Sequence, residues 1–317
     1  MKRYIVAAVF AIGMAVLFAT GCKKHNGELP RPNLEGRKLR VLATTSMIAD
    51  AAREVGGEHV EVDCLMPPPT DPHKYTAGAP DLERIRRADL VLYNGLHLEG
   101  KITDVLEARA KTAWTTAIAE DLPDLREAEE GFEGTHDPHV WFEVRMWMKA
   151  VEKVRDALAD IDPAHAEQYR ANATKYLERL ESLDKEIRDK LAKVPESRRV
   201  LITAHDAFGY FGRAYGFEVR GLQGVSTATD TSTRDVQELA DLIGTKRIRA
   251  IFGESSVPDN GILAVQQAVR SKYKGFEVKL AEDLLFSDAL GEPGTTAGTY
   301  IGMVRHNVDA IVRALGE

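Results

Sequence analysis

Apolar runs and amphipathic stretches alternate along most of the chain. In the first half, apolar runs predict strands over residues 38–44, 60–65 and 89–94. Helical periodicity predicts helices over residues 46–55, 81–88, 101–110 and 141–158. From residue 199 the alternation resumes, with strands predicted over 199–204, 250–253 and 276–280 and helices over 206–215, 232–243, 258–270 and 296–314. Such alternation predicts two α/β lobes with parallel sheets.

One segment between these halves keeps helical periodicity without a break. Asp162 suits the N-cap position and Pro163 the first helical position, and Pro195 ends the pattern. Its apolar positions are Tyr169, Ala173, Tyr176, Leu180, Leu183, Ile187, Leu191 and Val194. At 1.5 Å per residue, the stretch 164–194 predicts a rod ~45 Å long. One arm of a coiled coil is the alternative, but the pattern favours a single long spine helix, residues 162–195, that joins the lobes.

The N-terminus has the pattern of a signal peptide. Lys2 and Arg3 precede an uncharged, apolar stretch over residues 4–21, and Cys22 follows. The segment 19–22 resembles a bacterial lipobox, which implies cleavage after residue 21 and a lipid on Cys22. This predicts an extracytoplasmic lipoprotein anchored at its N-terminus, in the periplasm or at the cell surface. A signal anchor is the alternative, because the apolar run is nearly long enough to span a membrane.

Composition sets further bounds. After a polar tether over residues 22–37, 280 residues remain, enough for an N-terminal lobe (38–161), the spine and a C-terminal lobe (196–317). A net charge of −7 argues against nucleic acid as a partner. The only other cysteine, Cys64, lies in a predicted strand and is expected to be a buried, inert thiol. We expect a monomer.

Three histidines follow stiff turns or strand ends. The tripeptide Asp-Pro-His ends at His73 and again at His139, and the proline in each restricts the backbone. His205 follows the apolar run 200–202. Open α/β sheets bind ligands at the ends of their strands. Imidazole suits Zn, Mn, Fe or Cu, and Asp288, in a loop after the last predicted strand, could complete four ligands. These residues predict a metal site in the cleft between the lobes.

Other residues are candidates to support this site. Asp71, Asp137, Asp206 and Glu254 are candidates to hold the imidazoles through hydrogen bonds, although loop aspartates commonly cap turns instead. Four histidines are expected to be ordinary surface or helix residues: His25, His59, His165 and His306. His97 and His136 are harder to exclude from a supporting role.

Five motifs together resemble one family. They are the segments 71–75 (DPHKY), 93–99 (YNGLHLE), 137–142 (DPHVWF), 203–208 (TAHDAF) and 287–291 (SDALG). They resemble the zinc- and manganese-specific solute-binding lipoproteins of ABC transporters, the TroA-like family, over essentially all of residues 38–317. The resemblance implies that His73, His139, His205 and Asp288 bind the metal, and that a rigid spine limits movement of the lobes.

Subgroup markers of that family leave the metal open. Manganese-selective members often have Glu where this chain has His205. Zinc-scavenging members often carry a long His-rich loop before the second ligand, whereas residues 127–139 here are acidic, with only His136 before His139. The implied cargo is one divalent transition metal ion, Zn²⁺ or Mn²⁺, with Fe²⁺ as a further candidate.

The implied function is capture of this ion outside the cytoplasmic membrane and delivery to an ABC permease for import, without enzymatic activity. The alternative is a zinc-dependent hydrolase that uses the same cluster. A hydrolase needs an open coordination position and a nearby general base, whereas four protein ligands fill a tetrahedral site, and the sequence contains no His-Glu-x-x-His motif. Cell adhesion is a role also ascribed to such lipoproteins, and no separate feature of the sequence supports it.

Overall fold

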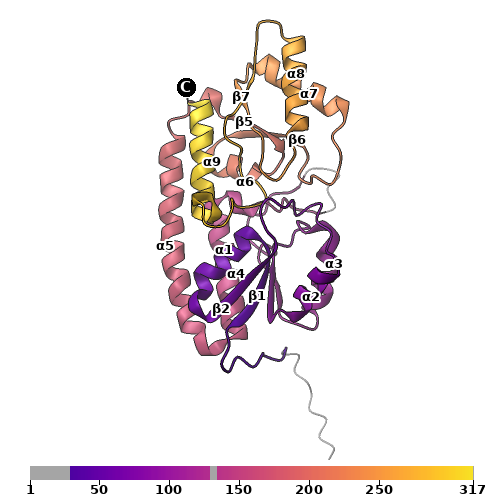
Figure 1. The fold of residues 1–317 in the computed structure, drawn as a ribbon. Coiled ribbons are helices and arrows are strands. Elements are labelled where there is room, and N and C mark those ends of the chain that lie inside the picture. The colour runs from indigo at the N-terminus through magenta and orange to yellow at the C-terminus, as the bar shows by residue number, and fades with distance from the viewer. Residues whose placement is uncertain (1–28, 129–133, 317) are drawn as a thin grey trace, which may run out of the picture.

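The computed structural model describes residues 29–128 and 134–316. The predicted signal peptide, Cys22 and the first part of the tether therefore lie outside the described residues. Within those residues, no helix combines the length and apolar character needed to cross a membrane. Figure 1 shows two α/β lobes alongside a long helix, which confirms the predicted fold class.

The N-terminal lobe is built on a four-stranded sheet in the order β2-β1-β3-β4, with every strand pair parallel. The strands are β1 (Leu39–Thr45), β2 (Val60–Met66), β3 (Leu90–Tyr93) and β4 (Thr115–Ala117), and the helices are α1 (Ser46–Gly56), α2 (Ala79–Arg87) and α3 (Thr103–Ala110). The central strands β1 and β3 are almost completely buried because elements pack on both faces. Sequence patterning missed β4 because it has three residues and no apolar run. Cys64, on the edge strand β2, is half-buried rather than buried as predicted.

A 3-10 turn replaces the predicted start of the next helix. Val140–Phe142 forms this turn, and α4 (Val144–Ile161) begins after it. The backbone N–H groups of Phe142 and Glu143 donate to carbonyls three residues back, the pattern of a 3-10 helix. The predicted start at Trp141 was therefore wrong by one turn.

The spine is shorter at both ends than its periodicity suggests. Pro163–His165 forms a 3-10 turn, and the α-helix α5 (Ala166–Leu191) has 26 residues, about 39 Å at 1.5 Å per residue. The predicted N-cap, Asp162, does not cap the helix. Its carboxylate accepts hydrogen bonds from Tyr169 Oη and His165 Nδ1, both at 2.7 Å.

The C-terminal lobe contains two parallel strand pairs. They are formed by β5 (Val200–His205) with β6 (Glu218–Gln223), and by β7 (Ala250–Ile251) with β8 (Lys279–Leu280). The backbone N–H of Phe252 donates to the carbonyl of Ile202 at 2.9 Å, which joins the two pairs. The helices are α6 (Gly209–Tyr215), α7 (Thr233–Lys246), α8 (Asn260–Lys272) and α9 (Tyr300–Leu315). A capping box of Ser232 and Asp235 opens α7. Patterning missed β6, which alternates little.

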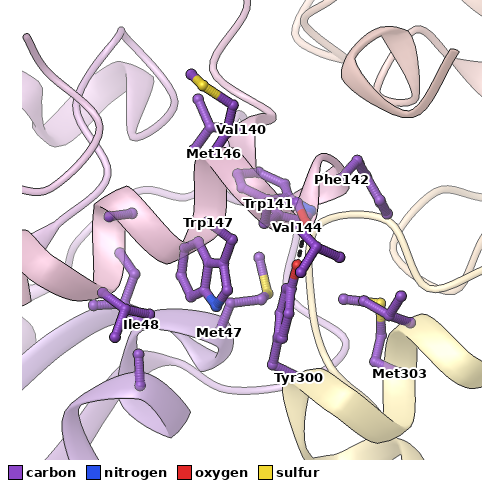
Figure 2. Close-up of a cluster of buried hydrophobic side chains, with 14 of the residues drawn as sticks. Met47, Ile48, Val140, Trp141, Phe142, Val144, Met146, Trp147, Tyr300 and Met303 are labelled. Atoms are coloured by element: carbon purple, nitrogen blue, oxygen red, sulfur yellow. Dashed lines mark hydrogen bonds between the residues drawn. The ribbon is translucent and has the colours of Figure 1, made fainter. Parts of the chain in front are cut away.

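The two lobes share one hydrophobic core. A single buried cluster takes in residues of β1, α1, α4, α5, α6 and α9. At its centre Trp147 stacks on Tyr300, with ring centroids 5.1 Å apart, and Met47 lies beside them (Figure 2). In Figure 1, α5 runs along both lobes with α9 next to it in the upper half. Because helices from both lobes pack on the same spine, the lobes are held in a fixed relation.

Candidate metal centre

Four side chains from distant loops meet between the lobes. His73 lies in the loop after β2, His139 just before the 3-10 turn, His205 at the end of β5 and Asp288 in the loop after β8. One nitrogen or oxygen atom of each lies within 4.8 Å of the corresponding atom of every other, and all four residues are at most 3% exposed. The structure therefore brings together the four residues that the sequence predicted as ligands.

The ring nitrogens and the carboxylate converge on one point. Nε2 of His73 lies 3.3 Å from Nε2 of His139. Oδ1 of Asp288 lies 3.5 Å from Nε2 of His139, and Oδ2 of Asp288 lies 3.3 Å from Nε2 of His205. Two candidate ligands come from each lobe, so a bound ion would link the lobes directly.

His139 is oriented by the aspartate of its own Asp-Pro-His turn. Asp137 Oδ1 accepts the backbone N–H of His139 at 3.0 Å and lies 2.8 Å from its Nδ1. Arg126 donates to the other oxygen of Asp137 at 2.8 Å. This arrangement places the proton of the ring on Nδ1 and leaves Nε2 with its lone pair directed at the centre.

His205 has an equivalent partner that is distant in sequence. Glu254 follows β7; its Oε1 accepts the backbone N–H of His205 at 2.9 Å, and its Oε2 lies 2.6 Å from Nδ1. Both residues are buried. Glu254 therefore fixes the backbone and the ring of His205 together.

The third imidazole is held differently. Asp71 Oδ1 accepts the backbone N–H of His73 at 3.0 Å and makes no hydrogen bond with its ring. The other oxygen of Asp71 accepts the hydroxyl of Thr227, at 2.6 Å, from the loop between β6 and α7. The turn that carries His73 is thus tied to the opposite lobe.

The loop that carries Asp288 is fixed from both lobes. The indole N–H of Trp141 donates to the carbonyl of Ser287 at 2.9 Å, and the hydroxyl of Tyr300 donates to the carbonyl of Trp141 at 2.7 Å, drawn as a dashed line in Figure 2. Ser256 Oγ lies 3.3 Å from Asp288 Oδ2. These bonds leave Asp288 little freedom to turn away.

Burial and charge shift the acid–base properties of the cluster. Burial lowers the pKa of His73 to about 3, so this ring is neutral at physiological pH. Burial also disfavours the charged form of His205, but the Glu254 and Asp288 carboxylates raise the pKa of His205 well above its ordinary value. Burial opposes ionisation of Asp288, yet the imidazoles, His205 first, hold the pKa of this carboxyl below its usual range. A metal ion must therefore displace a proton from His205.

The donor set fits a transition metal ion. Nε2 of His205 and Oδ1 of Asp288, which face the centre, are buried and make no hydrogen bond with any described residue. Buried polar atoms in proteins are almost always paired, and a cation is one explanation for such a cluster. Three imidazoles and a carboxylate match a closed, four-coordinate site.

The other candidates from the sequence lie elsewhere. Asp206 donates its backbone N–H to the carbonyls of Gln223 and Gly224, which anchors the end of β5 to β6. His97 is exposed, and His136 lies 2.8 Å from the hydroxyl of its neighbour Thr135. Sequence reasoning missed three contributors, Trp141, Thr227 and Ser256. Trp141 could have been noticed from its place two residues after His139, whereas the other two carry no local signal.

Two α/β lobes on one long helix, with a buried three-histidine, one-carboxylate cluster between them, define a class of metal-binding receptor. The family model of the zinc-uptake complex component A (periplasmic), ZnuA, matches residues 41–314, and the chain belongs to this family.

The chain is similar to known metal-binding proteins over nearly its whole length. The chain is 48% identical to the manganese-binding lipoprotein MntA of Bacillus subtilis, covering 95% of this chain and 97% of that protein. It is 43% identical to the zinc-binding protein TroA of Treponema pallidum, covering both chains fully. The solved structure of periplasmic TroA superposes with a TM-score of 0.84 at 45% identity, over 88% of this chain and 99% of that one. The family consists of solute-binding proteins of ABC transporters, which are not enzymes, and this supports the transport interpretation over the hydrolase.

Proposed function

We propose that the chain captures one divalent transition metal ion outside the cytoplasmic membrane and delivers it to an ABC permease for import. The observation that carries this proposal is the cluster of His73, His139, His205 and Asp288, buried between two lobes. Its relatives named for manganese and for zinc bind ions of the same class. The ion is cargo, held by protein ligands alone.

The donor set favours zinc on thermodynamic grounds. Three nitrogen donors and one carboxylate bind Zn²⁺ more tightly than Mn²⁺ by the Irving–Williams order. The ion carried in the cell also depends on availability, so Mn²⁺ and Fe²⁺ stay within the proposal. Some relatives are named for manganese and others for zinc, which is consistent with a fold that can bind either ion.

Metal titration tests the proposal. The metal-free protein is titrated with Zn²⁺ and Mn²⁺, alongside His205→Ala and Asp288→Ala. One equivalent should bind, and each variant should weaken binding strongly because it leaves three ligands. His97→Asn is the matched control, since it removes an exposed imidazole and asparagine tolerates the positive φ of 60° at that position. No stoichiometric binding, or binding indifferent to both alanine variants, would refute the proposal.

We also propose that a lipid on Cys22 anchors the chain and that it acts as a monomer. The relatives named as lipoproteins support the anchor. Expression in a bacterial host with a radiolabelled fatty acid should label the wild type and leave Cys22→Ser unlabelled. Sedimentation of the lipid-free chain, with and without metal, should give one monomeric species. Its mass should lie slightly below the 35.0 kDa of the full chain once the predicted signal peptide is removed.

A further inference from the structure

The three imidazoles of the centre are not equally supported. His139 has Asp137 on its Nδ1 and His205 has Glu254, at 2.8 and 2.6 Å. Nδ1 of His73 is buried and makes no hydrogen bond with any residue that the structure describes. A carboxylate on the far nitrogen fixes the orientation of a metal-binding imidazole. The ring of His73 lacks this constraint, so its position depends on its backbone.

That backbone is set by one side chain. Asp71 Oδ1 accepts the N–H of His73 at 3.0 Å, closing the turn across Pro72. A turn held by an aspartate two residues earlier keeps its shape only while the carboxylate keeps its rotamer. What holds Asp71 therefore also determines where His73 lies.

Thr227, from the C-terminal lobe, holds Asp71. Its hydroxyl donates to Asp71 Oδ2 at 2.6 Å, across 156 positions of sequence. Thr227 is 0% exposed, although residues 228–230 next to it are exposed. The hydroxyl of Thr227 is buried beside three exposed residues, and its single donor is used on a carboxylate of the other lobe, so it forms a specific contact between the lobes.

We propose that Thr227 is a positioning residue for metal retention. Its hydroxyl holds Asp71, Asp71 holds the backbone of His73, and His73 is the first of the four ligands to leave when the loop at residues 224–232 moves. This inference rests on the proposed metal-binding function and deepens it. It assigns control of release to a loop that contributes no ligand, while the shared core keeps the lobes in place.

The test is the rate of metal release from the purified protein. Each variant is loaded with one equivalent of Zn²⁺ and mixed rapidly with excess chromophoric chelator. Thr227→Val keeps the shape of the side chain and removes the hydroxyl, and should release Zn²⁺ about tenfold faster, the effect expected from losing a hydrogen bond to a charged acceptor. Thr227→Ser should restore the rate to within about twofold. Thr229→Val, at an exposed position of the same loop, is the control.

A double-mutant cycle separates positioning of His73 from a general structural effect. Thr227→Val should weaken Zn²⁺ binding in the wild type but add nothing further in a His73→Ala background. The metal-free protein also loses this hydrogen bond, so its thermal midpoint should fall by only a few degrees in Thr227→Val, and by the same amount in the His73→Ala background. An unchanged release rate, failure of serine to restore it, or equal weakening in both backgrounds would overturn the inference. If the wild type itself fails to bind Zn²⁺ stoichiometrically, the proposed function fails instead.

Discussion

Substitution of Glu254 by glutamine tests the electrostatics of the centre most directly. The two oxygens of Glu254 serve two donors of His205, the backbone N–H at 2.9 Å and ring Nδ1 at 2.6 Å. Glutamine has a similar shape, but it offers one acceptor oxygen and one NH₂ group, which only donates. Glu254→Gln can therefore satisfy one of the two donors and leaves the other facing an NH₂ group.

Two opposing effects set the magnitude. A lost hydrogen bond to a charged group costs about 1.5–3 kcal/mol, which is roughly 10- to 150-fold in affinity, and loss of an outer partner of a metal ligand typically costs about 10- to 100-fold. In the opposite direction, Glu254 helps to raise the pKa of His205, so in the wild type the metal competes with a proton. Glutamine reduces that competition at neutral pH. We therefore expect zinc affinity to fall about tenfold at pH 7, and by more above the pKa of His205, where the wild type no longer carries the proton.

Calorimetric titration in buffers of different ionisation enthalpy measures both effects together. At pH 7 the wild type should release close to one proton per Zn²⁺ bound, because the raised pKa keeps His205 protonated in the metal-free state. Wild-type affinity should rise with pH until it reaches that pKa and then level off. Glu254→Gln should release fewer protons and show a flatter pH dependence.

The same substitution at Glu282, an exposed residue of the same lobe, is the control and should change neither quantity. If Glu254→Gln bound zinc as tightly as the wild type and released as many protons, the orienting and charging role assigned to Glu254 would be wrong. Tighter binding at every pH would show that the proton penalty outweighs the lost hydrogen bond.

Three further predictions concern stability. Leu180→Ala empties a fully buried position of the spine and should lower the free energy of unfolding by about 2–5 kcal/mol in urea denaturation. Zn²⁺ at about 1,000 times its dissociation constant should raise the free energy of unfolding by ~4 kcal/mol, and a chelator should reverse the gain. Burial raises the pKa of Asp50 to about 6, so between pH 4 and 6 the folded wild type keeps a proton that the unfolded chain has lost. Wild-type stability should therefore fall relative to Asp50→Asn as pH rises through this window, by roughly 2–3 kcal/mol in total.

Each of these predictions has its own control. Glu181→Ala, on the exposed face of the spine, should cost little, and a loss equal to that of Leu180→Ala would contradict the shared core. Zinc should fail to stabilise Asp288→Ala at the same concentration; equal stabilisation would place the ion elsewhere. Parallel pH profiles for the wild type and Asp50→Asn would show that Asp50 titrates normally.

The three candidate imidazoles could be predicted because each has a local signal. Proline stiffens the turns before His73 and His139, and an apolar run ends at His205, so sequence neighbours alone mark these imidazoles as presented on fixed backbone. Asp137 could be recognised for the same reason, since it contacts the histidine two residues later. The long helix was recognisable from eight apolar positions at helical spacing. Its start was misjudged because Pro163–His165 is a 3-10 turn, and its end because residues 192–194 form a turn beyond the α-helix.

The contacts that hold the site together could not be predicted in this way. The Thr227–Asp71 hydrogen bond joins residues 156 positions apart, and the Trp141–Ser287 hydrogen bond joins residues 146 apart. A threonine in a polar loop looks the same whether its hydroxyl faces solvent or a carboxylate of the other lobe. The strands β4 and β6 were not predicted for a related reason. Short or weakly alternating strands are defined by the strands they pair with rather than by their own side chains.

The imidazole ligands have local signals in the sequence and the contacts between the lobes have none, which corresponds to two separate requirements, binding the ion and releasing it. Ligands must be presented rigidly, and the Asp-Pro-His turn of His139 achieves that within its own sequence, because Asp137 holds both the backbone and the ring of the histidine. Release must depend on an outside event, because a site with every support built into the neighbouring sequence has no contact that a partner could break. His139 has its support within its own turn, whereas the support of His73 ends at Thr227 on a loop with exposed residues. A partner that displaced that loop would loosen one ligand and leave the shared core intact.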